Sequence, residues 1–234
     1  MRLLLALAVV TLAAQPTPPT LERRTFKMPD GTMARYGLAV PGDYTASSPR
    51  PLVVALHPGG SSGMVFYGDR YMRSVFLPGL QGLDPIMIAP DAPAGAWTEP
   101  KAEQVVLSLV TAVAGEFAVD KSRMLLAGFS MGGGGAWYLS ARHPTLFTAA
   151  IVMAGRTAEP IEALARIPTY VIHSRADEVV PFEQAEVRAA ALEKLGRPIH
   201  FEALNGVGHF NMGGYMGALQ RGGQWVREQW GRVR

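Results

Sequence analysis

The chain has 234 residues, of which 48% are apolar and 18% charged, so it can bury the core of one large domain and is not intrinsically disordered. The formal net charge is +3 and the basic residues form no block, so nucleic acid is not an expected partner. The lack of cysteine excludes disulfides, a thiol nucleophile and cysteine metal ligands.

The N-terminus has the composition of an export signal. Arg2 precedes a short apolar run that ends in small residues near Ala14, which is typical of a secretory signal peptide. The run is too short to span a bilayer as a helix, so we expect no stable membrane anchor; a buried helix is the structural alternative. We expect residues 1–14 to be a signal peptide, 15–24 an extended leader and 25–234 one folded domain, exported to the periplasm or the medium.

Apolar runs bounded by glycine and proline predict strands, and apolar residues at helical spacing predict helices. In chain order, the expected strands are 24–28, 33–40, 51–56, 86–89, 124–129, 148–153, 169–173 and 199–204. The expected helices are 101–117, 133–141, 161–166, 182–195 and a C-terminal helix through Leu219, Val226, Trp230 and Val233, in which Gly222 and Gly223 are candidate interruptions.

This order of elements predicts a fold of the α/β class. Strands that alternate with helices favour a mostly parallel central sheet with helices on both faces. The first two strands have no helix between them, so they should form an antiparallel N-terminal edge of that sheet. No segment is left over for a lid domain, and we therefore expect a single domain.

Residues 128–132, Gly-Phe-Ser-Met-Gly, have the G-x-S-x-G pattern of a nucleophile elbow between an expected strand and an expected helix. A serine at such a turn stands above the sheet edge in a strained backbone conformation. Ser130 is therefore the candidate nucleophile, and a plain glycine-rich turn is the alternative. The N–H of Met131 begins the helix, where unpaired N–H groups and the helix dipole favour an oxyanion.

Asp177 and His209 follow the last two expected strands. Because the carboxyl ends of parallel strands meet at one sheet edge, both should lie near Ser130. His209 would take the serine proton and return it to the leaving group, and Asp177 would orient the imidazole. Glu178 is an alternative acid, and a histidine satisfied by the loop backbone is the alternative reading of His209.

A second oxyanion donor is expected after the third strand, where residues 57–60 read His-Pro-Gly-Gly. Pro58 has no N–H to donate. Gly59 is therefore the candidate donor, with Gly60 as the alternative. A plain glycine-rich turn that donates to no oxyanion is the other possible interpretation.

Pocket walls and cofactor sites are less clearly marked in the sequence. Trp97, Phe210 and Tyr67 lie in expected loops at the same edge and are candidate pocket residues, although most aromatic side chains are simply core. No pair of histidines has metal-ligand spacing with acidic neighbours, so we expect neither a metal nor another cofactor.

Four motifs together resemble the α/β-hydrolase superfamily: Leu-His-Pro-Gly-Gly at 56–60, Gly-Phe-Ser-Met-Gly-Gly at 128–133, Asp-Glu-Val-Val-Pro at 177–181 and Gly-His at 208–209. The resemblance covers residues 25–230 and extends to small secreted esterases grouped with polyhydroxybutyrate depolymerases and feruloyl or acetylxylan esterases, and to bacterial carboxylesterase/phospholipase-type enzymes. It departs at Pro58, where relatives often have glycine, and in the lack of disulfides.

The resemblance implies an α/β-hydrolase catalytic domain, with Asp177 rather than Glu178 as the acid. It also implies hydrolysis of a small-molecule or polymeric carboxylic ester through a Ser-His-Asp triad and an acyl-enzyme. The same triad serves peptidases, thioesterases and acyltransferases, so these stay open. A non-catalytic binding protein with this fold is the remaining alternative.

Overall fold

The computed structural model describes residues 17–60, 63–93 and 95–232; the expected signal peptide lies outside the described residues. The strands are β1 Thr20–Lys27, β2 Met33–Val40, β3 Arg50–Leu56, β4 Ile86–Pro90, β5 Val119–Phe129, β6 Ala149–Met153, β7 Thr169–Ser174 and β8 Ile199–Leu204. The α-helices are α1 Tyr67–Tyr71, α2 Leu77–Leu80, α3 Pro100–Glu116, α4 Met131–Arg142, α5 Phe182–Lys194 and α6 Met216–Arg232. Shorter turns are a π-helix at Met72–Phe76 and 3-10 helices at Gln81–Leu83, Ile161–Ala163 and Met212–Tyr215.

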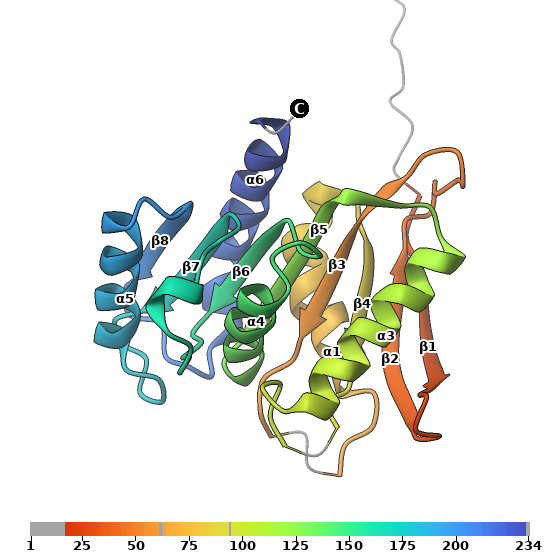
Figure 1. Ribbon diagram of the computed structural model, residues 1–234, viewed down its shortest axis with the longest axis horizontal. Coiled ribbons are helices and arrows are strands. Elements are labelled where there is room, and N and C mark those ends of the chain that lie inside the picture. The colour runs from red at the N-terminus through yellow and green to blue at the C-terminus, as the bar shows by residue number, and fades with distance from the viewer. Residues whose placement is uncertain (1–16, 61–62, 94, 233–234) are drawn as a thin grey trace, which may run out of the picture.

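The strands form one sheet in the order β1-β2-β4-β3-β5-β6-β7-β8 (Figure 1). β2 is antiparallel to both β1 and β4, whereas all other neighbours are parallel. The expected mostly parallel sheet with an antiparallel N-terminal edge is thus confirmed. The loops that follow β3, β5, β7 and β8 leave the sheet at the same edge, which is where ligands bind in such folds.

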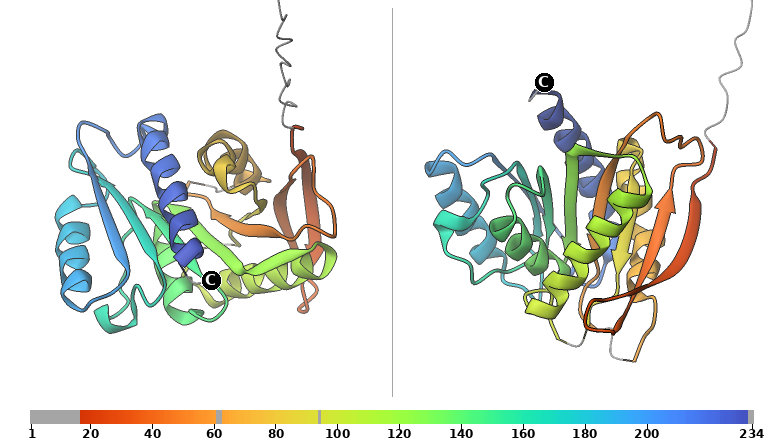
Figure 2. Two further views of the ribbon diagram at one scale, coloured as in Figure 1. Left: turned by 90° about the horizontal axis from the view of Figure 1, so that it is seen from above. Right: turned by 45° about the vertical axis from the view of Figure 1, so that its right-hand side comes forward.

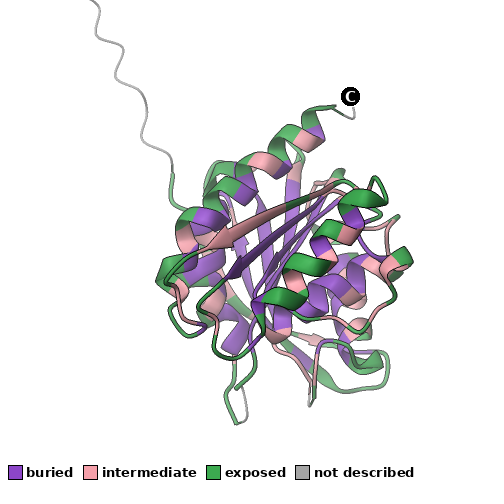
Figure 3. Cartoon of the chain, turned by 90° about the vertical axis from the view of Figure 1, so that its left-hand side faces the viewer, coloured by how far each residue is buried: buried purple, intermediate pink, exposed green. Residues whose placement is uncertain are grey.

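Helices cover both faces of the sheet: α3, α4 and α5 lie on one face, and α6 and the helical segment 67–83 on the other (Figure 2). Successive residues of β3 alternate between two cores, since Leu52 and Val54 pack toward α3 and Val53 packs toward α6. Central parallel strands buried on both sides read as continuous apolar runs, whereas the outward faces of the helices are exposed (Figure 3). Within the described residues, no helix has the length and apolar character needed to cross a membrane.

The N-terminal part of the chain differs from the expected leader at 15–24. β1 begins at Thr20, because residues 20–23 pair with the end of β2 along the same antiparallel ladder. Two residues before β1, the Pro18 carbonyl oxygen lies so close to Gly42 that a β-carbon at Gly42 would overlap it. The alternating exposure of β1 is typical of an edge strand, and it is a weak signal in the sequence.

Three helical segments also differ from expectation. No helix or strand was predicted for the segment 67–83, which forms short α, π and 3-10 turns. The expected helix 161–166 is a single 3-10 turn. Gly222 and Gly223 do not interrupt α6; a β-carbon at Gly222 would lie 3.1 Å from the Tyr170 ring, so glycine lets the helix pack close to the sheet.

Candidate active site

Ser130 lies at the turn between β5 and α4, with a φ of 55° and a ψ of −115°. This conformation is rare for a residue other than glycine and costs about 1–3 kcal/mol. The surrounding backbone holds it: the Ser130 N–H donates to the Met153 carbonyl of β6, and the Ser130 carbonyl accepts from Gly134, both at 2.9 Å. The serine is therefore fixed at the sheet edge.

The first turn of α4 contains four consecutive glycines, residues 132–135, which let the helix begin against its neighbours. Each is approached by a different part of the chain, so a side chain there would push α4 away from the sheet. A β-carbon would overlap the Leu56 carbonyl at Gly132 and the Trp97 side chain at Gly135, and would lie 2.6 Å from the Met153 oxygen at Gly133 and 2.8 Å from the Arg156 oxygen at Gly134.

Gly132→Ala is expected to lower the free energy of unfolding by about 3 kcal/mol, because the Leu56 carbonyl cannot retreat without moving β3. At a solvent-exposed position within a helix, a change from glycine to alanine normally raises the free energy of unfolding by about 1 kcal/mol. The control is Gly115→Ala in α3, where a β-carbon meets nothing within 4 Å and stability should be equal or higher. Urea denaturation compares the two; equal stability of both variants would contradict this packing.

The structure brings Ser130, His209 and Asp177 together from the ends of β5, β8 and β7. Nε2 of His209 lies 2.8 Å from the Ser130 hydroxyl, and Nδ1 lies 2.8 Å from Oδ2 of Asp177. The imidazole is buried, and the Phe129 ring packs against it at 5.1 Å between centroids. With Nδ1–H donating to Asp177, the Nε2 lone pair is available to accept the serine proton.

Asp177 is held as a carboxylate. Its Oδ1 accepts the N–H groups of Val179 at 2.9 Å and Val180 at 2.7 Å, while Oδ2 faces His209. Burial raises the pKa of Asp177, but the hydrogen bonds from His209 and from the two backbone N–H groups outweigh it, so the pKa lies below the ordinary aspartate value. The group is therefore ionised and can stabilise a charged imidazole.

Glu178 contacts the main chain of His209 and not its ring. Its Oε2 accepts the backbone N–H of His209 at 2.9 Å, and it makes no hydrogen bond with the ring. Two adjacent carboxylates thus hold one histidine, Asp177 through the side chain and Glu178 through the main chain. Asp177, the residue that the resemblance favours, is thus the acid in contact with the ring.

A second histidine lies behind the triad acid. His173, fully buried at the end of β7, has Nε2 2.9 Å from the Val180 carbonyl and 3.4 Å from Oδ2 of Asp177. Burial lowers the pKa of His173 against the opposing effect of the Val180 hydrogen bond, so the ring is neutral near pH 7. No functional role was predicted for His173 from the sequence; its position four residues before Asp177 was the available signal.

The loop after β3 lies beside the start of α4. A β-carbon at Gly59 would be 3.9 Å from Cβ and Sδ of Met131, so the two candidate oxyanion donors adjoin. Gly60 has a φ of 88°, which favours glycine at this position. Both glycines stay candidates on these positions alone.

The three candidate pocket residues occupy different environments. Trp97 is fully buried in the core, and its Nε1 donates to the His57 carbonyl at 2.9 Å, so its expected role as a pocket wall is wrong. Tyr67 is also buried, with its hydroxyl toward the Gly59 carbonyl. Phe210 is 80% exposed and lies beside the His209 ring, so its role at the mouth of the site stays a prediction.

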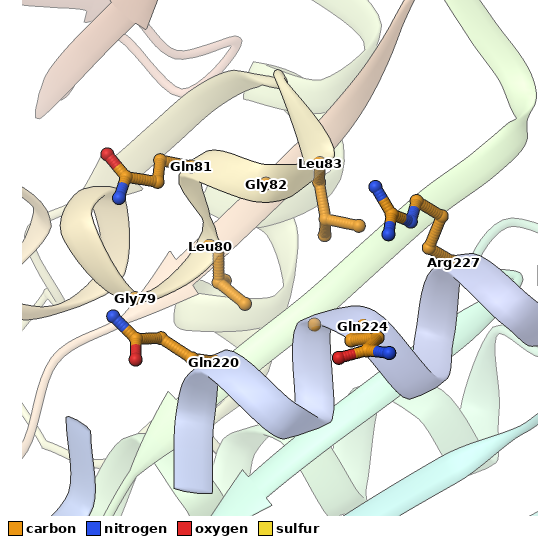
Figure 4. Close-up of a pocket in the computed structure, with 9 residues that line it drawn as sticks. Gly79, Leu80, Gln81, Gly82, Leu83, Gln220, Gln224 and Arg227 are labelled. Carbon is orange, nitrogen blue, oxygen red and sulfur yellow. The ribbon is translucent and has the colours of Figure 1, made fainter. Parts of the chain in front are cut away.

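A separate groove of about 260 Å³ lies between the α2 region and α6 (Figure 4). Both elements pack on the opposite face of the sheet from α4. It contains no residue of the Ser-His-Asp cluster. Its polar side chains are Gln81, Gln220, Gln224 and Arg227. In the described part of the chain, no three His, Asp or Glu side chains are grouped as a metal site requires.

Comparison with known proteins finds similarity to esterases. Residues 89–192, which include Ser130 and Asp177, match a family model described as putative esterase. The chain is 29% identical over 169 residues to a probable feruloyl esterase C of Aspergillus flavus, covering 70% of this chain and 62% of that protein. A probable feruloyl esterase C of Aspergillus niger is 30% identical over 63% of this chain and 56% of its own length. The chain thus spans less than two thirds of these relatives.

Solved structures give the same fold. A thermostable esterase has 26% identity and a TM-score of 0.74, over 89% of this chain and 62% of its own. An S-formylglutathione hydrolase of Staphylococcus aureus has 15% identity and a TM-score of 0.71, over 92% and 99% of the two chains. The sheet order, the strained serine turn and these similarities together show that the chain has the α/β-hydrolase fold.

Proposed function

We propose that the protein is an exported serine esterase that hydrolyses carboxylic esters through an acyl-enzyme on Ser130. The observation that carries this proposal is the continuous hydrogen-bonded line from the Ser130 hydroxyl through His209 to Asp177, with 2.8 Å at each step. The esterase names of the relatives support the same reaction class. The proposed export depends on the composition of residues 1–14.

The chemistry follows from the hydrogen bonds. His209 Nε2 takes the Ser130 proton as the oxygen attacks the ester carbonyl, and the resulting oxyanion faces the N–H groups of Met131 and the Gly59 loop. The charged imidazole is stabilised by Asp177 and then gives its proton to the leaving alcohol. Water enters, loses a proton to Nε2, and releases the acid from the serine, which regains its proton.

The proposed substrate is a small-molecule or polymeric ester. The feruloyl esterase names of the relatives favour an aromatic acyl group, and the exposed Phe210 ring beside the catalytic histidine offers an aromatic surface for one. The triad also suits thioesters, peptides or acyl transfer to an alcohol. A comparison of products formed with and without added alcohols separates hydrolysis from transfer.

A fluorophosphonate probe and an ester panel test the function. We expect the probe to label Ser130, located by mass spectrometry, and p-nitrophenyl esters from acetate to decanoate and a feruloyl ester to be hydrolysed. The chain length with the highest kcat/KM reports the size of the acyl pocket. Labelling of Ser130 without hydrolysis of any ester would contradict the esterase proposal; no labelling would contradict a serine hydrolase altogether.

A further inference from the structure

Three successive carbonyl groups in the loop after β3 each accept a hydrogen bond from an aromatic side chain. Trp97 Nε1 donates to the His57 carbonyl at 2.9 Å. Nδ1 of His57 lies 2.6 Å from the Pro58 carbonyl, and the Tyr67 hydroxyl lies 3.4 Å from the Gly59 carbonyl. His57 belongs to the loop itself, but Trp97 and Tyr67 come from two other segments, so the local sequence of the loop does not by itself explain this arrangement.

The state of the His57 ring follows from its two contacts. Nε2 accepts the Ala92 N–H at 3.0 Å, so Nδ1 carries the proton that goes to Pro58. Burial lowers the pKa of His57 against the opposing effect of the Pro58 hydrogen bond, which keeps the ring neutral near pH 7 and this tautomer in place.

The aromatic rings also pack against one another. The His57 ring lies edge-on to Tyr67 at 4.9 Å and to Trp97 at 5.0 Å between centroids. The Tyr67 and Tyr71 hydroxyls are 3.2 Å apart. A phenol has one proton, so while Tyr67 donates to Gly59, Tyr71 supplies the proton between the two tyrosines. Burial, together with Tyr67, raises the pKa of Tyr71 to about 12, which keeps that proton in place.

The direction of a carbonyl sets the direction of the next N–H. A trans peptide is planar, so its C=O and N–H point in opposite directions, and the described chain has no cis peptide. Fixing the Pro58 carbonyl against His57 therefore turns the Gly59 N–H away from the aromatic cluster. Fixing the Gly59 carbonyl against Tyr67 turns the Gly60 N–H away from the aromatic cluster in the same way. The hydrogen bond from His57 to the Pro58 carbonyl, at 2.6 Å, is shorter than the contact of Tyr67 with the Gly59 carbonyl, at 3.4 Å. Gly59 is also the glycine that lies beside Met131.

We propose that His57, with Tyr67 and Trp97, is a positioning residue that aims the Gly59 N–H at the oxyanion formed on the Ser130 adduct. The proposal rests on the serine esterase function above and chooses Gly59 over Gly60 as the second donor. A preoriented donor acts on the transition state and little on the bound substrate, so its loss should appear in kcat.

Two substitutions of His57 separate the two ring contacts. Glutamine places an acceptor near the position of Nε2 and loses the donor to Pro58, whereas asparagine places an amide N–H near the position of Nδ1. We expect His57→Gln to lower kcat about 100-fold with KM changed less than about 3-fold, and His57→Asn to recover most of that loss. Tyr67→Phe should lower kcat by no more than about 10-fold, because its hydroxyl holds the Gly59 carbonyl, which orients the Gly60 N–H and not the Gly59 N–H, while its ring contact with His57 is kept.

A control variant outside the aromatic cluster and three measurements separate the positioning role of His57 from the proposed esterase function. Tyr44→Phe removes a hydroxyl that accepts from Ala118, away from the aromatic cluster, and should leave kcat unchanged. All variants are compared by kcat and KM on one p-nitrophenyl ester, by inhibition with a boronic acid as a transition-state mimic, and by Tm.

The kinetic results test the positioning role of His57 and the esterase function separately. Weaker boronic acid inhibition in parallel with lower kcat in His57→Gln, at unchanged KM, supports the positioning role. Wild-type kcat in His57→Gln, equal losses in His57→Gln and His57→Asn, or a larger loss in Tyr67→Phe would overturn it and leave the esterase intact. A wild-type protein that hydrolyses no ester would instead contradict the proposed function.

Discussion

Ser130→Ala is expected to lower kcat for ester hydrolysis by about 10⁵- to 10⁶-fold, because the acyl-enzyme cannot form without the hydroxyl. The residual rate would come from the oxyanion donors and from binding alone. KM should change little, since alanine removes no group that holds the ground-state ester. The fold should also be kept, because alanine retains the β-carbon and removes only the hydroxyl, whose printed contact is with His209.

The matched control is Ser140→Ala, ten residues further along in α4. Ser140 is buried and its hydroxyl donates to the Trp137 carbonyl at 3.1 Å, a helical contact away from the reaction. We expect its kcat to equal that of the wild type. Steady-state kinetics and fluorophosphonate labelling compare both variants. Full ester hydrolysis by Ser130→Ala would assign the activity to another group and remove the triad from the mechanism.

The sequence was most informative where strong local patterns coincide. The strand at 124–129, the G-x-S-x-G turn and the following glycines predicted one structure, and β5, the turn at Ser130 and α4 have that structure. Asp177 and His209 could be placed beside the serine because parallel strands deliver their loops to one edge. The proximity of these three residues therefore followed from topology, although they are far apart in the chain.

Other features depended on tertiary contacts that no local pattern records. Trp97 was expected to face substrate, yet its indole turns inward, where its N–H has the His57 carbonyl as a partner. The helical turns between residues 67 and 83 contain Gly68, Pro78 and Gly79, which weaken helix propensity, and packing against α6 overrides it.

The contacts of the two acids could not be worked out from their spacing, and the preference for Asp177 depended on the resemblance alone. Asp177 and Glu178 are adjacent and chemically alike, so spacing cannot assign one to the ring of His209. Only the geometry shows that the shorter side chain reaches Nδ1, while the longer one reaches the main chain. This assignment leads to a direct test.

Asp177→Asn is expected to lower kcat about 10⁴-fold, because an amide can donate to Nδ1 of His209 and so favour the tautomer in which Nε2 carries the proton. That Nε2 cannot accept the Ser130 proton. Glu178→Gln removes the same charge from the adjacent residue but keeps an oxygen that accepts the His209 N–H, so kcat should fall less than about 10-fold. Similar losses in the two variants would show that the charge of the loop, and not the contact with Nδ1, supports catalysis.

The stability of the two variants should also differ with pH. The pKa of Asp177 is lowered in the folded protein, so its carboxylate stabilises the fold at any pH above the ordinary aspartate pKa, and that stabilisation is lost as pH falls through the lower folded value. Asp177→Asn lacks this group, and its free energy of unfolding should therefore fall less on acidification than that of the wild type. Glu178→Gln keeps Asp177 and should retain the Asp177 contribution to the wild-type acid dependence. Urea denaturation at a series of acidic pH values measures the difference, and parallel curves for Asp177→Asn and the wild type would show that Asp177 is not stabilised as a carboxylate in the fold.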